Sequence, residues 1–148
     1  MFQVDMYTDG SCSGNGTETA VGGWCAILRY NGVEKEYHGW ESHTTNNRME
    51  LRAVIEGVRQ LKHPCHVTVY TDSQYVVTSA YSMKKWLKSN KPHANMDMWY
   101  ELIRVGRDGQ HKIQFQHAKG HAGDPMNERC DKIARSEATK STKNRKEN

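Results

Sequence analysis

Alternating apolar and polar residues at the start of the chain predict a small antiparallel sheet. Residues 2–8 (FQVDMYT) place an apolar side chain at every second position, which is the period of a strand with one buried face. Two further strand-like runs, residues 22–30 and 33–40, flank Asn31-Gly32, a dipeptide typical of a two-residue hairpin because both positions favour positive φ. The string SCSGNG after the first run predicts a loop. We therefore expect three consecutive antiparallel strands.

Helical and strand patterns alternate in the rest of the chain. Residues 44–61 repeat apolar side chains at spacings that put them on one face of a helix. Residues 67–71 form a short β-branched run that is typical of a strand. Further along we expect a helix at residues 73–87, a helix at residues 97–105, a strand at residues 112–118 and a final helix.

The final helix is predicted to begin at Asp124-Pro125, because Asp is a favoured N-cap residue and Pro is favoured at the first helical position. Apolar residues then recur on one face as far as Ala138 and are absent from Thr139 onward. We therefore expect a domain over residues 1–138 and a basic, disordered tail over residues 139–148.

This order of elements predicts an α/β fold. Short connections make the first three strands antiparallel, and helical crossovers make the later strands parallel to the first. The result is a mixed five-stranded sheet flanked by helices. Ligands in such sheets tend to bind at the carboxyl ends of parallel strands, and we expect Asp9 and Asp72 to lie at two such ends.

Length and composition fit one globular domain. The chain has 148 residues, of which 36% are hydrophobic and 26% charged. No apolar run approaches the ~18 residues that span a bilayer, and no secretory signal opens the chain, so we expect a cytoplasmic protein without membrane contact. The four cysteines include no CxxC pair, which argues against a zinc site and favours reduced thiols, with Cys25 and Cys130 in the core.

Positive charge is concentrated at the C-terminal end. The net charge is +4, and residues 135–148 carry five Lys/Arg against two Glu, or +3 of that total. A basic tail suggests a polyanionic partner. Alternatively, it is a solvated end that binds nothing.

Four carboxylates stand in distinctive contexts: Asp9 in YTDGSCSGN, Glu50 in TTNNRMEL, Asp72 in YTDSQYV and Asp131 in KGHAGDPMNERCD. Acidic groups gathered at one edge of a sheet repel one another and usually need a cation between them. Hard divalent ions such as Mg²⁺ take oxygen ligands of this kind. The four acids therefore predict metal-assisted phosphodiester chemistry with two Mg²⁺ ions ~4 Å apart, one activating water and one stabilising the leaving 3′ oxygen. Mn²⁺ is an alternative ion.

Each carboxylate also has an interpretation without chemistry. Asp9 before a glycine is typical of a turn, and Glu50 could complete a capping box. Asp72 could be a helix N-cap, and Asp131 could be a solvated helical residue paired with Arg135. Each alternative is sound alone, but together they leave four acids at one edge of the predicted sheet.

His121 lies in the glycine-rich string KGHAGD just before the final helix. A loop histidine beside a carboxylate cluster can shuttle protons near neutral pH. The alternative is an ordinary surface histidine, which suits most of the eight histidines in the chain.

The four strings TDGSCSGN, TTNNRMEL, TDSQYV and KGHAGDPMNERCD resemble a type 1 ribonuclease H in its bacterial form, over roughly residues 2–136. The resemblance implies the ribonuclease H-like fold and cleavage of the RNA strand of an RNA/DNA hybrid, leaving 5′-phosphate and 3′-hydroxyl ends. It assigns metal binding to Asp9, Glu50, Asp72 and Asp131, and assistance with proton transfer and product release to His121.

The resemblance also implies substrate contacts. Asn and Gln side chains can both donate to and accept from 2′-hydroxyls and minor-groove base edges, which suits recognition of a hybrid without reading its sequence. The positions that match minor-groove or backbone contacts are Cys12, Asn15, Asn46, Asn47 and Gln74. Thr45 matches a contact to a DNA phosphate, and Asn95 matches a further substrate contact.

The chain departs from the family in its basic handle. Between TDSQYV and Asp97 it is shorter than bacterial members with a long handle by roughly two helical turns. It keeps a basic stretch with one aromatic residue: Lys84, Lys85, Trp86, Lys88 and Lys91. We interpret this stretch as a reduced handle that grips DNA phosphates through charge. The alternative is a solvated helix end with Trp86 packed inward.

The sequence thus predicts a monomeric, Mg²⁺-dependent endoribonuclease that acts on RNA/DNA hybrids. One rival is a binding module of the same fold without catalysis, against which the complete set of acids argues. Another is a different metal nuclease of this fold, such as an exonuclease or junction resolvase. The set of amide side chains near the acids argues against that second rival.

Overall fold

The computed structural model describes residues 1–89, 93–118 and 125–147, with side chains described as far as residue 140. Its elements are β1 (Phe2–Ser13), β2 (Val21–Tyr30), β3 (Val33–Ser42), α1 (Asn46–Arg59), β4 (Cys65–Thr71), α2 (Gln74–Tyr81), α3 (Met83–Lys88), α4 (Met96–Asp108), β5 (Lys112–His117) and α5 (Pro125–Glu147).

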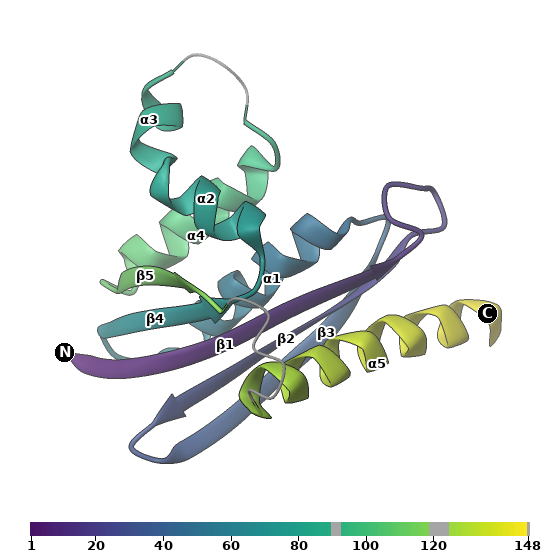
Figure 1. Ribbon diagram of the computed structural model, residues 1–148, viewed down its shortest axis with the longest axis horizontal. Helices are drawn as coiled ribbons and strands as arrows, with labels where there is room; N and C mark the ends of the chain where they lie inside the picture. The colour runs from purple at the N-terminus through teal and green to yellow at the C-terminus, as the bar shows by residue number, and fades with distance from the viewer. Residues whose placement is uncertain (90–92, 119–124, 148) are drawn as a thin grey trace.

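The predicted mixed sheet is confirmed. The five strands lie in the order β3-β2-β1-β4-β5 (Figure 1). β1 pairs antiparallel with β2, and β2 with β3, whereas β4 is parallel to both β1 and β5. The hairpin between β2 and β3 turns at Asn31 and Gly32, whose φ values of 49° and 77° are those the dipeptide predicts.

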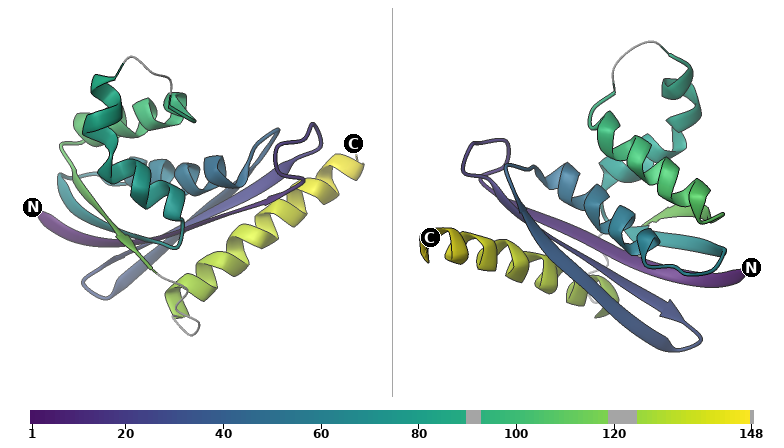
Figure 2. Two further views of the ribbon diagram at one scale, coloured as in Figure 1. Left: turned by 45° about the horizontal axis from the view of Figure 1, so that its top comes forward. Right: turned by 180° about the vertical axis from the view of Figure 1, so that it is seen from behind.

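Helices cover both faces of the sheet. α1 to α4 lie on one side and α5 on the other, as the two views of Figure 2 show. Neighbouring residues of β1 serve the two sides in turn, because successive side chains of a strand point to opposite faces. Met6 belongs to the larger core, which includes Leu51 of α1, whereas Tyr7 belongs to a smaller core with Ile27 and Cys130.

β1 is longer than the sequence predicted. It continues through the residues SCS, which we expected to form a loop, so Asp9 lies inside the strand and not at its end. Ser11 and Cys12 pair with Gly23 and Gly22 of β2. Small and polar residues in both strands resemble loop composition, but long-range pairing holds them in the sheet.

The helix predicted at residues 73–87 is two helices, α2 and α3. They are separated at Ser82, whose φ and ψ of −90° and 0° interrupt the helical path. The indole Nε1 of Trp86 donates to the carbonyl oxygen of Ser79 at 3.0 Å. The change of direction thus lets Trp86 turn back into the larger core, where its side chain is buried.

α5 carries the predicted apolar stripe, since Met126, Cys130, Ala134 and Ala138 are all buried. The helix runs on to Glu147, however, where we expected order to be lost from residue 139. Ala138, the last apolar residue of the sequence, therefore lies before the end of the helix. The predicted cap at residue 124 lies outside the described residues. No helix in the described part of the chain is both long and apolar enough to cross a membrane.

Candidate active site

Three of the four predicted acids converge. One carboxylate oxygen from each of Asp9, Glu50 and Asp72 lies within 4.8 Å of the others. Asp9 comes from the middle of β1, Glu50 from the first turns of α1, and Asp72 from the residue after β4. Tyr7 of β1 pairs with Tyr70 of β4, so two residues further on Asp9 and Asp72 stand at the same level of the sheet.

Glu50 reaches the sheet because residue 10 has no side chain. A β-carbon on Gly10 would collide with the backbone nitrogen of Glu50 and the backbone carbon of Met49. α1 therefore rests directly on β1 at this point, which brings Glu50 beside Asp9. The glycine in the string YTDG thus serves packing and not a turn.

The carboxylates are held where their charges are costly. Asp9 is 7% exposed and Glu50 is 9% exposed, whereas Asp72 is exposed. Burial, followed by the negative charge of Asp72, raises the pKa of Asp9 from 3.8 to about 7. Burial and the charge of Asp9 likewise raise the pKa of Glu50 well above its usual value.

Glu50 also has an unused ligand atom. Its Oε2 is buried and finds no hydrogen-bond partner among the described residues. A buried acceptor without a donor is costly. Together with the raised pKa values, it indicates a site built for a positive charge, and carboxylate oxygens at this spacing suit a hard divalent cation such as Mg²⁺.

Asp131 borders this group from α5. Its side chain interacts with Asp9 and contributes to the raised pKa of that residue. Its Oδ1 also accepts a hydrogen bond from Arg135 Nε at 3.2 Å, so the ion pair considered from the sequence is present as well. A half-exposed carboxylate can make both contacts, and the surface pair contributes little stability.

The capping interpretations of Glu50 and Asp72 are wrong. α1 is capped by Thr45, whose Oγ1 accepts from the backbone N–H of Arg48 at 3.2 Å. α2 is capped by Ser73, whose Oγ accepts from the backbone N–H of Val76 at 3.2 Å. Each helix is therefore capped by a hydroxyl, which leaves the neighbouring acids free for the cluster.

One histidine among the described residues lies beside the acidic cluster. His121, the predicted proton shuttle, lies outside the described residues. His117, which was not predicted to belong to the site, ends β5 with its Nε2 3.2 Å from the carbonyl oxygen of Asp72. The sequence could have indicated this placement through position alone. The last residues of the adjacent parallel strands β4 and β5, Thr71 and His117, pair with each other at one edge of the sheet.

The predicted minor-groove or backbone contacts, except Gln74, gather at the N-terminal end of α1. Asn15 Oδ1 accepts from the backbone N–H of Asn46 at 2.7 Å, so the loop after β1 is fastened to the helix start. The thiol of Cys12 points to the carbonyl oxygen of Thr44 at 3.6 Å. Asn46 and Asn47 themselves are exposed. Three amide side chains thus lie at the start of the helix that carries Glu50.

Two predicted contact residues lie on the neighbouring helices. Gln74 is exposed at the start of α2, where its Nε2 donates to Thr78 Oγ1 at 2.8 Å. Asn95 precedes α4 and is tied by hydrogen bonds to Arg48 and Tyr75. Arg48 and Tyr75 were not predicted from the sequence, because they lie 47 and 20 residues away from Asn95.

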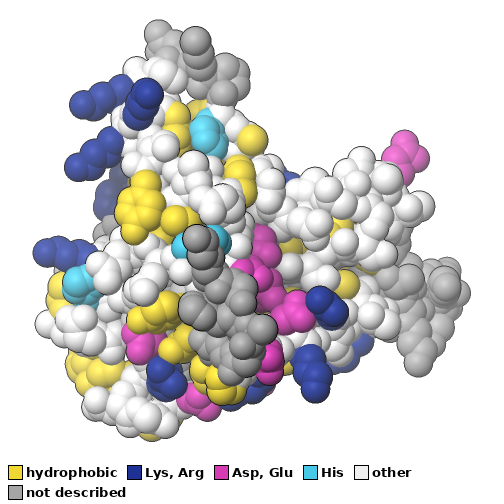
Figure 3. All heavy atoms as spheres, in the orientation of Figure 1, with side chains coloured by type: hydrophobic (Ala, Val, Ile, Leu, Met, Phe, Trp, Pro, Cys, Tyr) yellow, Lys and Arg dark blue, Asp and Glu magenta, His cyan; other side chains and the backbone are white. Residues whose placement is uncertain are grey.

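The basic stretch stands apart from the acids. Lys84, Lys85 and Lys88 of α3 are exposed, whereas Trp86 is buried and stacks on His93 with ring centroids 4.4 Å apart. Figure 3 shows acidic side chains gathered near the middle of one face and basic side chains over α3 at its edge. Trp86 therefore anchors α3 to the larger core, while the lysines of the same helix face solvent. Residue 91 lies outside the described residues.

Known proteins of one family match the chain along most of its length. The family model described as RNase H matches residues 2–139. A ribonuclease H of Caldicellulosiruptor saccharolyticus is 47% identical over 144 residues, which cover 92% of this chain and 96% of that relative. A ribonuclease H of Oleidesulfovibrio alaskensis is 47% identical over 150 residues, which cover 95% and 93% of the two chains.

Solved structures agree with this match. LC9-RNase H1, a type 1 RNase H with the type 2 active-site motif, superposes with a TM-score of 0.77 at 29% identity, covering 94% of this chain and 73% of that chain. LC11-RNase H1, solved in complex with an RNA/DNA hybrid, gives a TM-score of 0.74 at 20% identity over 93% and 98%. At 20% identity, the similarity to LC11-RNase H1 shows a shared fold only.

Proposed function

Because the chain belongs to the RNase H family, we propose that it is the metal-dependent endonuclease that hydrolyses the RNA strand of RNA/DNA hybrids. The observation that carries this proposal is the convergence of Asp9, Glu50 and Asp72, whose ligand atoms lie within 4.8 Å of one another. The buried Oε2 of Glu50, which has no hydrogen-bond partner among the described residues, supports it, because such an oxygen suits a hard divalent cation.

Asp9, Glu50, Asp72 and Asp131 would hold two Mg²⁺ ions. Ions bound there would supply an activated water and stabilise the leaving 3′ oxygen. The protein's own contribution is to bring carboxylates together from the sheet, from α1 and from α5. The products would carry 5′-phosphate and 3′-hydroxyl ends, and His121 would assist proton transfer and product release.

Recognition of the hybrid would fall to side chains around the N-terminal end of α1. Asn46 and Asn47 are exposed at the start of α1 and Gln74 at the start of α2, and all three can donate to and accept from ribose hydroxyls and base edges. Asn15 and Cys12 would hold the end of β1 and the loop after it against the start of α1. Thr45 would face a DNA phosphate, and Lys84, Lys85 and Lys88 would attract the backbone further away.

Cleavage of a labelled hybrid with Mg²⁺ tests the proposal. We expect cleavage within the RNA strand, no cleavage of duplex DNA of the same sequence, and loss of cleavage in Asp9→Asn with hybrid binding retained. A wild-type protein that shifts the hybrid in a gel but leaves it intact would instead be a binding module. Equal cleavage of duplex DNA would indicate another nuclease of this fold. We further propose that the protein acts as a cytoplasmic monomer.

A further inference from the structure

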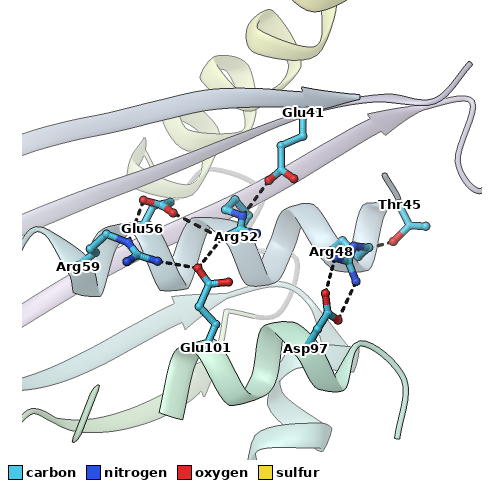
Figure 4. Close-up of polar contacts among 8 residues, drawn as sticks. All are labelled: Glu41, Thr45, Arg48, Arg52, Glu56, Arg59, Asp97 and Glu101. Atoms are coloured by element: carbon cyan, nitrogen blue, oxygen red, sulfur yellow. Dashed lines mark hydrogen bonds and ion pairs between the residues drawn. The ribbon is translucent and has the colours of Figure 1, made fainter. Parts of the chain in front are cut away.

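Arg48 joins the helix that carries Glu50 to the start of α4. Its Nη1 and Nη2 donate to Oδ1 and Oδ2 of Asp97 at 3.0 and 2.8 Å, a two-pronged pair that only a guanidinium can make (Figure 4). The same Nη1 lies 3.3 Å from Oδ1 of Asn95. One side chain thus holds two residues of the turn that leads into α4.

The turn at Asn95 is fixed from several sides. Asn95 has a φ of 62°, a left-handed conformation that a non-glycine residue keeps only where its surroundings hold it. Its Nδ2 donates to the hydroxyl of Tyr75 at 3.0 Å, and the same hydroxyl accepts from Trp99 Nε1 at 3.0 Å and donates to the carbonyl oxygen of Ala94 at 2.9 Å. The other end of the Asn95 side chain, Oδ1, accepts from Arg48.

Arg48 is also bonded to Thr45, the residue predicted to contact a DNA phosphate. Its backbone N–H donates to Oγ1 of Thr45, and Glu50 follows two residues later in the same helix. We propose that Arg48 is a positioning residue, which fixes Asn95 relative to Thr45 so that both can grip one phosphate of the DNA strand. This inference rests on the proposed function and concerns how the hybrid is held, not how the bond is cut.

A merely structural role would not require Arg48. The pair with Asp97 is partly exposed, with 30% and 65% of the two side chains accessible, and such pairs contribute little stability. α1 and α4 are also joined away from the site, where Glu101 Oε1 accepts from Arg52 at 3.0 Å and from Arg59 at 2.6 Å (Figure 4). The helices would therefore stay together without Arg48, and only the turn at Asn95 would loosen.

Steady-state kinetics on the hybrid separate the two roles. Arg48→Lys keeps the charge but loses the two-pronged geometry, and we expect it to raise KM roughly tenfold, the effect of one charge-assisted hydrogen bond, with kcat changed less than about twofold. Asp97→Asn should act in the same direction. Glu101→Gln, which breaks the pair away from the site, should leave KM unchanged. Equal KM values in Arg48→Lys and Glu101→Gln would overturn the inference, as would a fall in kcat at constant KM.

Neutral phosphates show whether the DNA strand is the partner. In a series of hybrids with one DNA phosphate replaced by a methylphosphonate, the wild-type protein should lose affinity at one position. Arg48→Lys should lose much less there and the same amount elsewhere. Wild-type protein that cleaves no hybrid would refute the proposed function itself. Wild-type cleavage with identical methylphosphonate profiles in both proteins would refute only the role of Arg48.

Discussion

Gly10 of β1 packs directly against the backbone of Glu50 in α1, and no β-carbon fits between them. The contact decides where the acidic cluster forms, because this close approach of α1 to the sheet brings Glu50 beside Asp9. The separation of strand and helix is thus part of the candidate site. A substitution that changes it should affect chemistry as well as stability.

Gly10→Ala should therefore displace α1 and its carboxylate. We expect a loss of stability of about 1–3 kcal/mol from overpacking and a fall in kcat of about 10²-fold, since a shift of ~1 Å in a reacting group can have that effect. Denaturant unfolding and hybrid cleavage measure the two. Gly106→Ala is the matched control, because its β-carbon would meet only the flexible end of Ile113. Full activity in Gly10→Ala would mean that the spacing is not needed.

The raised pKa of Asp9 makes stability depend on pH when metal is absent. The folded protein keeps a proton on Asp9 up to about pH 7, whereas the unfolded chain loses it near 3.8. Between these values the folded state binds more protons, so the free energy of unfolding falls as pH rises through this window. Asp9→Asn removes the effect and should be the more stable protein near pH 8, by on the order of a few kcal/mol.

Urea unfolding in EDTA checks this expectation. Well below pH 3.8, the wild-type carboxyl is protonated in both the folded and the unfolded state, so the stabilities of the two proteins should converge. Asp108→Asn, on an exposed part of α4, provides the control and should track wild type at every pH. A constant difference between Asp9→Asn and wild type across the range would contradict the role of burial and Asp72.

A divalent cation should relieve the same repulsion. Because the ion binds the folded cluster only, saturating Mg²⁺ at ~100 times its dissociation constant should stabilise the wild-type protein by about 2.7 kcal/mol. Asp9→Asn should show little of this gain. Asp97→Asn removes an acid that is not part of the cluster, so this variant should keep the full gain in stability. Thermal unfolding with Mg²⁺ against NaCl of equal ionic strength measures the difference, and equal gains in all three proteins would place the ion elsewhere.

Local patterns in the sequence predicted the sheet well because they report on periodicity and turn chemistry. Asn31-Gly32 fixes its hairpin through its own φ preferences, and the crossovers then dictate which strands are parallel. The same reasoning brought Asp9 and Asp72 to one level of the sheet. The prediction was correct although Asp9 lies in the middle of β1. The pairing register between β1 and β4, and not the end of either strand, places Asp9 level with Asp72.

Long-range contacts explain what the sequence did not predict. The interruption at Ser82 accompanies a hydrogen bond from Trp86 to Ser79 that no helical periodicity contains. Arg48 and Asp97 are 49 residues apart, and neither has a local pattern that would indicate a pair. The functional set that local strings identify is therefore the group of acids. The residues that hold the turn at Asn95 become visible only in three dimensions.

The lysines of α3 are placed to act through charge, because Trp86 beneath them is buried and keeps the short helix against the core. We expect Lys84→Gln with Lys85→Gln, made in an Asp9→Asn background that prevents cleavage, to weaken hybrid binding. Removing one lysine that neutralises a phosphate should reduce the slope of log affinity against log salt by about 0.7–0.9. The double change should therefore lower the slope by roughly 1.5.

Lys35→Gln with Lys62→Gln is the matched control for this charge effect. It removes two exposed lysines from the groove lined by Phe2 and Tyr30, which lies beyond the C-terminal end of α1, away from the acids. Net charge falls equally in the two double variants, so a general effect of charge would lower both slopes alike. A local grip on the hybrid predicts that only the Lys84 and Lys85 variant changes its slope, because counterions are released only where lysines and phosphates meet. Slopes lowered equally in the two variants would indicate a general effect of charge, and a slope unchanged in the Lys84 and Lys85 variant would leave α3 without a role in affinity.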